Sequence, residues 1–110
     1  MLTTMPAEDA AAALARTLVE ERLAACVNII GGVTSVYRWQ GEVQQDRECQ
    51  LLIKTREDLV EPLSERLRAL HPYEVPEFLV LPVAGGSNAY LAWLAESLPG
   101  ADGRSPTADR

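Results

Sequence analysis

One stretch decides the fold: residues 25–43 read ACVNIIGGVTSVYRWQGEV. It opens with β-branched residues, is interrupted by Gly31-Gly32, and then alternates side chains as far as Trp39. Alternation is the pattern of a half-buried strand, and glycine inside such a pattern marks a bulge or a bend. Gln40-Gly41 supplies a tight turn before the extended pattern resumes. The stretch therefore predicts a long β-hairpin.

The return arm of this hairpin changes character along its length. It is polar from Gln44 to Glu48 and mainly apolar from Cys49 to Ile53. Because a polar ribbon cannot be buried, we expect the tip to project into solvent or onto another subunit, while the base joins the core. An isolated hairpin of this length is marginally stable, so the base needs cover from other elements.

Amphipathic helices are expected on both sides of the hairpin. The first begins near Pro6, which suits the first helical turn, and continues through the alanine-rich residues 10–23. The second follows Thr55, which together with Asp58 has the form of a capping box. It continues to about Leu70, because leucines recur there at helical spacing before a proline.

Three further elements complete the predicted order. Residues 1–4 are just long enough for a short opening strand, and residues 78–83 read as a later strand. A third helix is expected after a cap at Ser87 or Asn88, and it ends before Pro99. Its predicted buried face consists of Tyr90, Trp93, Leu94 and Leu98.

This order of elements predicts an α+β protein, a ferredoxin-like sandwich in which an antiparallel sheet carries helices on one face. The other face must be solvated or covered by a partner, so we expect the chain to oligomerise. A length of 110 residues suits one domain, assigned to residues 1–98. Residues 99–110 mix Gly, Pro, Ser, Asp and Arg and are expected to form a disordered tail.

Charge and composition exclude several classes of function. Ten Lys and Arg residues stand against 16 Asp and Glu, a net charge of -6, and no basic patch is present for nucleic acid. Apolar runs are far shorter than a membrane span. The first residues do not resemble a secretory signal, which predicts a cytoplasmic location. Because that compartment keeps thiols reduced, Cys26 and Cys49 are expected to be free.

Five motifs follow one another along the chain. They are LVEERLAACVNI at residues 18–29, YRWQG at 37–41, IKT at 53–55, HPYEVPE at 71–77 and YLAWL at 90–94. Together they resemble, in order and spacing, the CutA divalent-ion tolerance family, over Thr3 to about Leu98. The resemblance implies a ferredoxin-like subunit, similar in topology to PII signalling proteins, that assembles as a homotrimer with hairpins reaching neighbouring subunits. It also implies a link to copper and other divalent metals.

The resemblance makes His71 and Cys26 the candidate metal ligands. His71 is the only histidine, and imidazole is the commonest ligand for copper or zinc, although this residue could instead cap its helix. Cys26 offers the thiolate that Cu(I) favours, although a cysteine among apolar strand residues is often an inert hydrophobe. Some family members have a cysteine near Thr3 and a histidine at Leu70. Because this chain has neither, we expect metal binding to be weak.

The other polar and aromatic members of the shared motifs could line a ligand pocket or pack at a trimer interface. They are Tyr37, Trp39, Lys54, Tyr73, Glu77 and Trp93. In the pocket interpretation these side chains hold a small anion or metabolite. In the interface interpretation they bury area between subunits, and Lys54 forms a neutralised pair with Glu77.

No catalytic motif stands out in the sequence. There is no Gly-x-Ser-x-Gly, no Walker-type glycine loop, and a single histidine without a fixed partner, so we expect a protein that is not an enzyme. The predicted function is divalent metal (copper) binding and tolerance by a cytoplasmic homotrimer without an organic cofactor. The alternative is a PII-like sensor of a small ligand or a trimeric interaction scaffold.

Overall fold

The computed structural model describes residues 1–100, so the predicted tail at 99–110 lies almost entirely outside the described residues. The elements in chain order are β1 (Leu2–Met5), α1 (Glu8–Glu20), β2 (Cys26–Trp39), β3 (Glu42–Lys54), the 3₁₀ helix η1 (Glu57–Leu59), α2 (Val60–Leu70) and α3 (Asn88–Glu96). None of the helices in this part of the chain has the length and apolar character needed to cross a bilayer.

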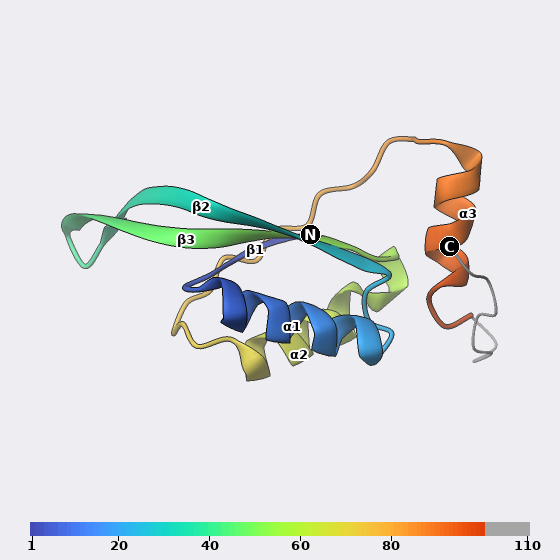
Figure 1. The fold of residues 1–110 in the computed structure, drawn as a ribbon, viewed down its shortest axis with the longest axis horizontal. Helices are drawn as coiled ribbons and strands as arrows, with labels where there is room; N and C mark the ends of the chain where they lie inside the picture. The colour runs from blue at the N-terminus through green and yellow to red at the C-terminus, as the bar shows by residue number, and fades with distance from the viewer. Residues whose placement is uncertain (101–110) are drawn as a thin grey trace.

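The strands form one antiparallel sheet in the order β1-β3-β2, with α1 and α2 on the same side of it (Figure 1). The predicted α+β class and the single helical layer are therefore confirmed. The order β1-α1-β2-β3-α2 agrees with the first five elements of the split βαβ arrangement. The opening strand is also confirmed, shifted by one residue, since it covers Leu2–Met5 rather than residues 1–4.

The predicted long hairpin is present and accounts for the elongated shape of the molecule (Figure 1). Its turn consists of Gln40 and Gly41, both with positive φ (50° and 83°), as a tight two-residue hairpin turn requires. Near the base, Ile30 pairs with Gln50, and Val33 is the next residue of β2 to pair. The two intervening glycines form the predicted bulge, which increases the twist of the ribbon.

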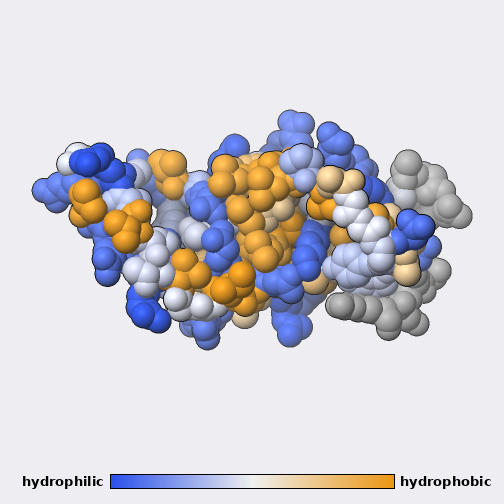
Figure 2. Space-filling model, turned by 90° about the horizontal axis from the view of Figure 1, so that it is seen from above, coloured by the Kyte–Doolittle hydropathy of each residue, from blue (hydrophilic) through white to orange (hydrophobic). Residues whose placement is uncertain are grey.

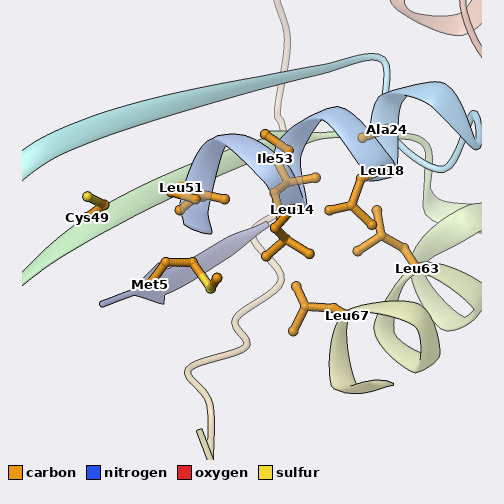
Figure 3. Packing of buried hydrophobic residues seen from close by; sticks show 11 residues of the cluster. Met5, Leu14, Leu18, Ala24, Cys49, Leu51, Ile53, Leu63 and Leu67 are labelled. Atoms are coloured by element: carbon orange, nitrogen blue, oxygen red, sulfur yellow. The ribbon is translucent and has the colours of Figure 1, made fainter. Parts of the chain in front are cut away.

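The core lies between the base of the sheet and the two helices (Figure 3). Leucine and isoleucine side chains from β3, α1 and α2 meet there, together with Met5 of β1. The largest contributors are Leu14, Leu18, Leu51, Ile53, Leu63 and Leu67. The helix α1 ends at Glu20 rather than at the predicted residue 23, since Arg22 adopts a left-handed conformation (φ 59°).

The predicted strand at residues 78–83 is wrong. Only Leu79 forms a bridge, with two backbone hydrogen bonds to Leu2 of 2.8 and 3.1 Å. Leu2 is the first residue of β1 and the bridge is antiparallel, so residues 80–83 extend past the N-terminal end of that strand. They meet no other strand in the described part of the chain. The segment is therefore extended but unpaired.

The third helix is present, and its predicted face is the more covered one, although only Leu98 is fully buried, whereas Tyr90, Trp93 and Leu94 are half-buried. Ser87 caps α3 as expected, its Oγ accepting from the Tyr90 N–H at 3.1 Å. No residue of α3 itself is fully buried, since Leu98 lies just after the helix. The helix stands apart from the other two (Figure 1) and is held at its C-terminal end by Arg56, which donates to the carbonyls of Ala95 and Pro99.

The predicted capping box at Thr55 and Asp58 is also wrong. The Thr55 hydroxyl donates instead to the Leu23 carbonyl oxygen at 2.7 Å, and Asp58 binds the guanidinium of Arg56. A 3₁₀ turn precedes α2, so Pro62 falls within the first turn of the regular helix, where its missing N–H costs no hydrogen bond.

Thr3 provides a test of this packing, because its fully buried hydroxyl has no hydrogen-bond partner in the described residues. Replacing it with the isosteric valine should raise the free energy of unfolding by about 1 kcal/mol. The matched Thr55→Val variant, which breaks the bond to Leu23, should lower it by a similar amount. Both are measured by denaturant unfolding at one protein concentration. A loss of stability in Thr3→Val would mean that its hydroxyl has a partner.

Candidate functional site

Residues 71–77, the HPYEVPE motif, form a strap that leaves the end of α2 and crosses to the sheet (Figure 1). Cys49 and Leu51 are buried under the helices, so Glu48 and Gln50, which alternate with them, belong to the opposite, open face. The strap contacts both residues of the open face, as described below. It therefore ties the helical layer to the open side of the hairpin.

His71 fixes the first residue of the strap. Its imidazole is only 8% exposed, and Nε2 lies 2.7 Å from the carbonyl oxygen of Thr4, on the outer edge of the sheet. Nδ1 accepts a hydrogen bond from the Tyr73 N–H at 3.1 Å. Because Nδ1 is an acceptor, the ring proton is on Nε2 and is donated to Thr4. Both ring nitrogens are thus used, and a metal ion could bind the ring only by displacing one partner.

Two tyrosine–carboxylate pairs lie on the open face of the hairpin. The hydroxyl of Tyr73 donates to Glu48 Oε2 at 2.7 Å, and that of Tyr37 donates to Asp46 Oδ2. Burial and the bond to Glu48 raise the pKa of Tyr73 well above its usual range, and the bond to Asp46 raises the pKa of Tyr37. Both phenols are therefore held in their neutral, hydrogen-donating form.

An open groove of about 800 Å³ lies between the strap and the hairpin. Its lining includes three predicted aromatic residues, Tyr37, Trp39 and Tyr73, and also the predicted Glu77. Glu77 is fixed by Gln50, whose Nε2 donates to its Oε2 at 2.8 Å. The groove carries four carboxylates, Asp46, Glu48, Glu74 and Glu77, and its lining contains no lysine, arginine or histidine. The site is therefore strongly acidic.

Lys54 and Trp93, the other two predicted residues, lie outside this groove. The Lys54 ammonium is 5.9 Å from the centroid of the Tyr90 ring, and the Trp93 ring packs against the same ring at a tilt of 40°, with centroids 5.4 Å apart. The predicted Lys54–Glu77 pair is wrong. Glu77 binds Gln50, which is four residues from Lys54 along β3, a separation of about 13 Å in an extended strand.

The structure does not bring the two predicted metal ligands together. Cys26 is half-buried and pairs with Lys54 across the sheet, whereas the partner of His71, Thr4, pairs with Gln50 further along β3. Residues 1–100 contain no group of three or more His, Cys, Asp or Glu side chains that could hold a metal ion. Cys49 is buried beside Glu8 and Asp9, and burial followed by these charges raises the pKa of its thiol.

Three carboxylates of the groove were not predicted from the motifs: Asp46, Glu48 and Glu74. A signal for two of them was present in the alternation of the return arm, where Gln44, Asp46 and Glu48 occur at every second residue and so share a face. No short sequence pattern could predict that the strap lies against that face, because the contacts join residues 25 or more positions apart.

Comparison with known proteins identifies a family. The family model described as CutA1 divalent ion tolerance protein matches residues 1–97. A divalent-cation tolerance protein CutA from Thermus thermophilus is 56% identical over 97 residues, which cover 88% of this chain and 94% of the relative. A solved structure of a divalent cation tolerance protein from Thermus thermophilus matches this chain with a TM-score of 0.85.

Two further relatives extend the comparison. The chloroplastic protein CutA of Arabidopsis thaliana is 53% identical over 94 residues, covering 86% of this chain. The chain spans about half the length of that plant relative (52%). A solved structure from Archaeoglobus fulgidus, described as a periplasmic divalent cation tolerance protein, is 30% identical with a TM-score of 0.84, covering 87% of this chain and 93% of that one.

The Tyr73–Glu48 bond predicts a pH-dependent contribution to stability. Since the folded pKa of Tyr73 lies above its ordinary value of 10.0, the unfolded chain loses the phenolic proton first as pH rises. The contribution is therefore fully present below about pH 10 and is lost above it. Tyr73→Phe should lower the free energy of unfolding by about 1.5 kcal/mol at neutral pH. This difference should shrink above pH 10 in denaturant unfolding; a constant difference would contradict the assignment.

Proposed function

We propose that this chain, which belongs to the CutA1 divalent ion tolerance family, acts in divalent-cation tolerance. In this proposal it is a homotrimer that binds copper and is not an enzyme. In this proposal the subunits associate in a PII-like manner through their open sheet faces and hairpins. The observation that supports it most directly is the extent of apolar surface that a single chain leaves uncovered.

That apolar surface lies on the open side of the sheet (Figure 2). Ile30 of β2 is 46% exposed, and the unpaired segment after Leu79 exposes Val80, Leu81 and, at 76%, Val83. Such a patch, next to an extended segment that pairs with no strand of the described residues, is typical of a surface that pairs with another strand. A second copy of the chain would supply both the strand and the apolar cover. At the far end of the hairpin, exposed Trp39 would provide an anchor for a neighbouring subunit.

The ligand donors of one subunit support weak copper binding. Cys26 is the more accessible of the two thiols, and a thiolate suits Cu(I). His71 could contribute only after giving up Thr4 or Tyr73 as a partner. Since the described residues offer no cluster of three donors, Cys26 would act with ligands from other copies or from solvent. Copper here is a bound ligand rather than a resident cofactor.

The alternative, a PII-like sensor of a small anion, receives less support from the site. Its groove carries four carboxylates and no basic lining residue, so an anion would be repelled. A cytoplasmic location is also part of our proposal. Its support is that both cysteines are free thiols, as a reducing compartment maintains them.

Native mass spectrometry with added Cu(I), Cu(II) and Zn(II) tests the assembly and the metal binding together. We expect a trimer that gains copper in steps, because each subunit contributes one accessible thiol. Cys26→Ser should abolish the uptake, whereas the matched Cys49→Ser variant, which alters a buried thiol, should retain it. A monomer would refute the assembly proposal. A trimer that stays free of metal, or equal loss in both variants, would refute the assignment of Cys26.

A further inference from the structure

The outer part of the hairpin has two faces of opposite character. Side chains alternate along each strand, and directly paired residues share a face, so the register assigns every residue to one side of the ribbon. Asp46 and Glu48 belong to the open face. The reverse face alternates with them and continues the side of β3 that carries buried Cys49 and Leu51. It consists of Thr34, Val36, Arg38, Val43, Gln45 and Arg47.

This reverse face is uncovered, because the hairpin projects beyond the two helices that cover its base (Figure 1). All six of its residues are exposed, and its two valines, Val36 and Val43, are 63% and 64% exposed. Its only charged residues are Arg38 and Arg47, and neither takes part in the three ion pairs found within residues 1–100. Two exposed valines between two unpaired guanidinium groups are suited to contact with an acidic, partly apolar surface.

The groove between the strap and the hairpin is such a surface. Asp46, Glu48 and Glu77 each accept a hydrogen bond from a neutral donor, so they keep their charge, and the lining contains no basic residue. Between the carboxylates the lining is aromatic and aliphatic, and includes Trp39 and Val75, the latter 67% exposed. Arginine pairs with carboxylates and also stacks on aromatic rings, and the groove offers both partners.

One chain cannot bring these two surfaces together. Asp46 of the groove and Arg47 of the reverse face are consecutive residues of β3, so the ribbon itself lies between the two faces. The reverse face can therefore enter only the groove of another copy. Since each copy offers one surface of each kind, contacts between copies run head to tail, and such contacts are all satisfied when a ring closes.

We propose that the hairpin of one copy docks by its reverse face in the acidic groove of the next. Arg38 and Arg47 pair with the groove carboxylates, and Val36 and Val43 lie against its aromatic and aliphatic wall. This inference rests on the proposed homotrimer and specifies which surfaces join its subunits. Charge complementarity of the two surfaces fixes the register of the contact.

Dissociation of the oligomer in urea, followed by light scattering, tests the docking, because urea carries no charge and leaves ion pairs unscreened. In Arg38→Glu, Arg47→Glu we expect the dissociation constant at a fixed urea concentration to rise at least tenfold, since like charges then meet. The matched control, Arg16→Glu, Arg68→Glu, changes the net charge equally at exposed positions of α1 and α2. It should stay within about threefold of the parent.

A charge-swapped chain provides the second arm. It adds Asp46→Lys and Glu74→Lys, the two exposed carboxylates of the groove, to Arg38→Glu, Arg47→Glu. Opposite charges face each other again, so this chain should associate at least tenfold more tightly than Arg38→Glu, Arg47→Glu alone. Circular dichroism verifies that every variant is folded.

Three results would overturn the docking. Equal weakening in both arginine variants would mean that assembly responds only to net charge. A folded charge-swapped chain that does not recover would mean that these two surfaces do not meet. A parent trimer that Arg38→Glu, Arg47→Glu leaves unchanged would contradict the docking alone, whereas a monomeric parent would contradict the proposed homotrimer as well.

Discussion

The hydrogen bond between His71 Nε2 and the Thr4 carbonyl is the contact on which the site depends. It joins the end of α2 to the edge of β1, across 67 residues of sequence. The second ring nitrogen then fixes the Tyr73 N–H, which directs the phenol to Glu48. One buried, neutral imidazole thus sets the path of the strap, and the strap forms one wall of the groove. Without it, Thr4 would leave an unsatisfied acceptor at the sheet edge.

Both ring nitrogens of His71 are engaged in hydrogen bonds, which limits its use as a metal ligand. A histidine that holds the fold together through both nitrogens is a poor ligand, since coordination would cost the contacts that position Tyr73. In our copper proposal, Cys26 is therefore the donor of this subunit that remains accessible. A thiolate there suits a soft metal.

Local features of the sequence predicted the fold well. The turn at Gln40-Gly41, the glycine bulge and the Ser87 cap each depend on residues a few positions apart. The errors concern long-range partners. Residues 78–83 have a strand pattern, but only Leu79 pairs with another strand of the described residues. Glu77 binds Gln50 rather than Lys54, because the strap meets β3 four residues before that lysine. Four of the predicted residues, Tyr37, Trp39, Tyr73 and Glu77, line one groove, whereas the carboxylates beside them required the register of the hairpin.

The ring nitrogens of His71 give the most direct test of this interpretation. Two-dimensional ¹H–¹⁵N spectroscopy of the single histidine, recorded with and without Cu(I), reports its tautomer and any metal bond. We expect a neutral ring protonated at Nε2, with shifts that do not change when copper is added. A ring protonated at Nδ1, or an Nε2 resonance that moves with copper, would show that His71 is a ligand and that the strap is held in another way.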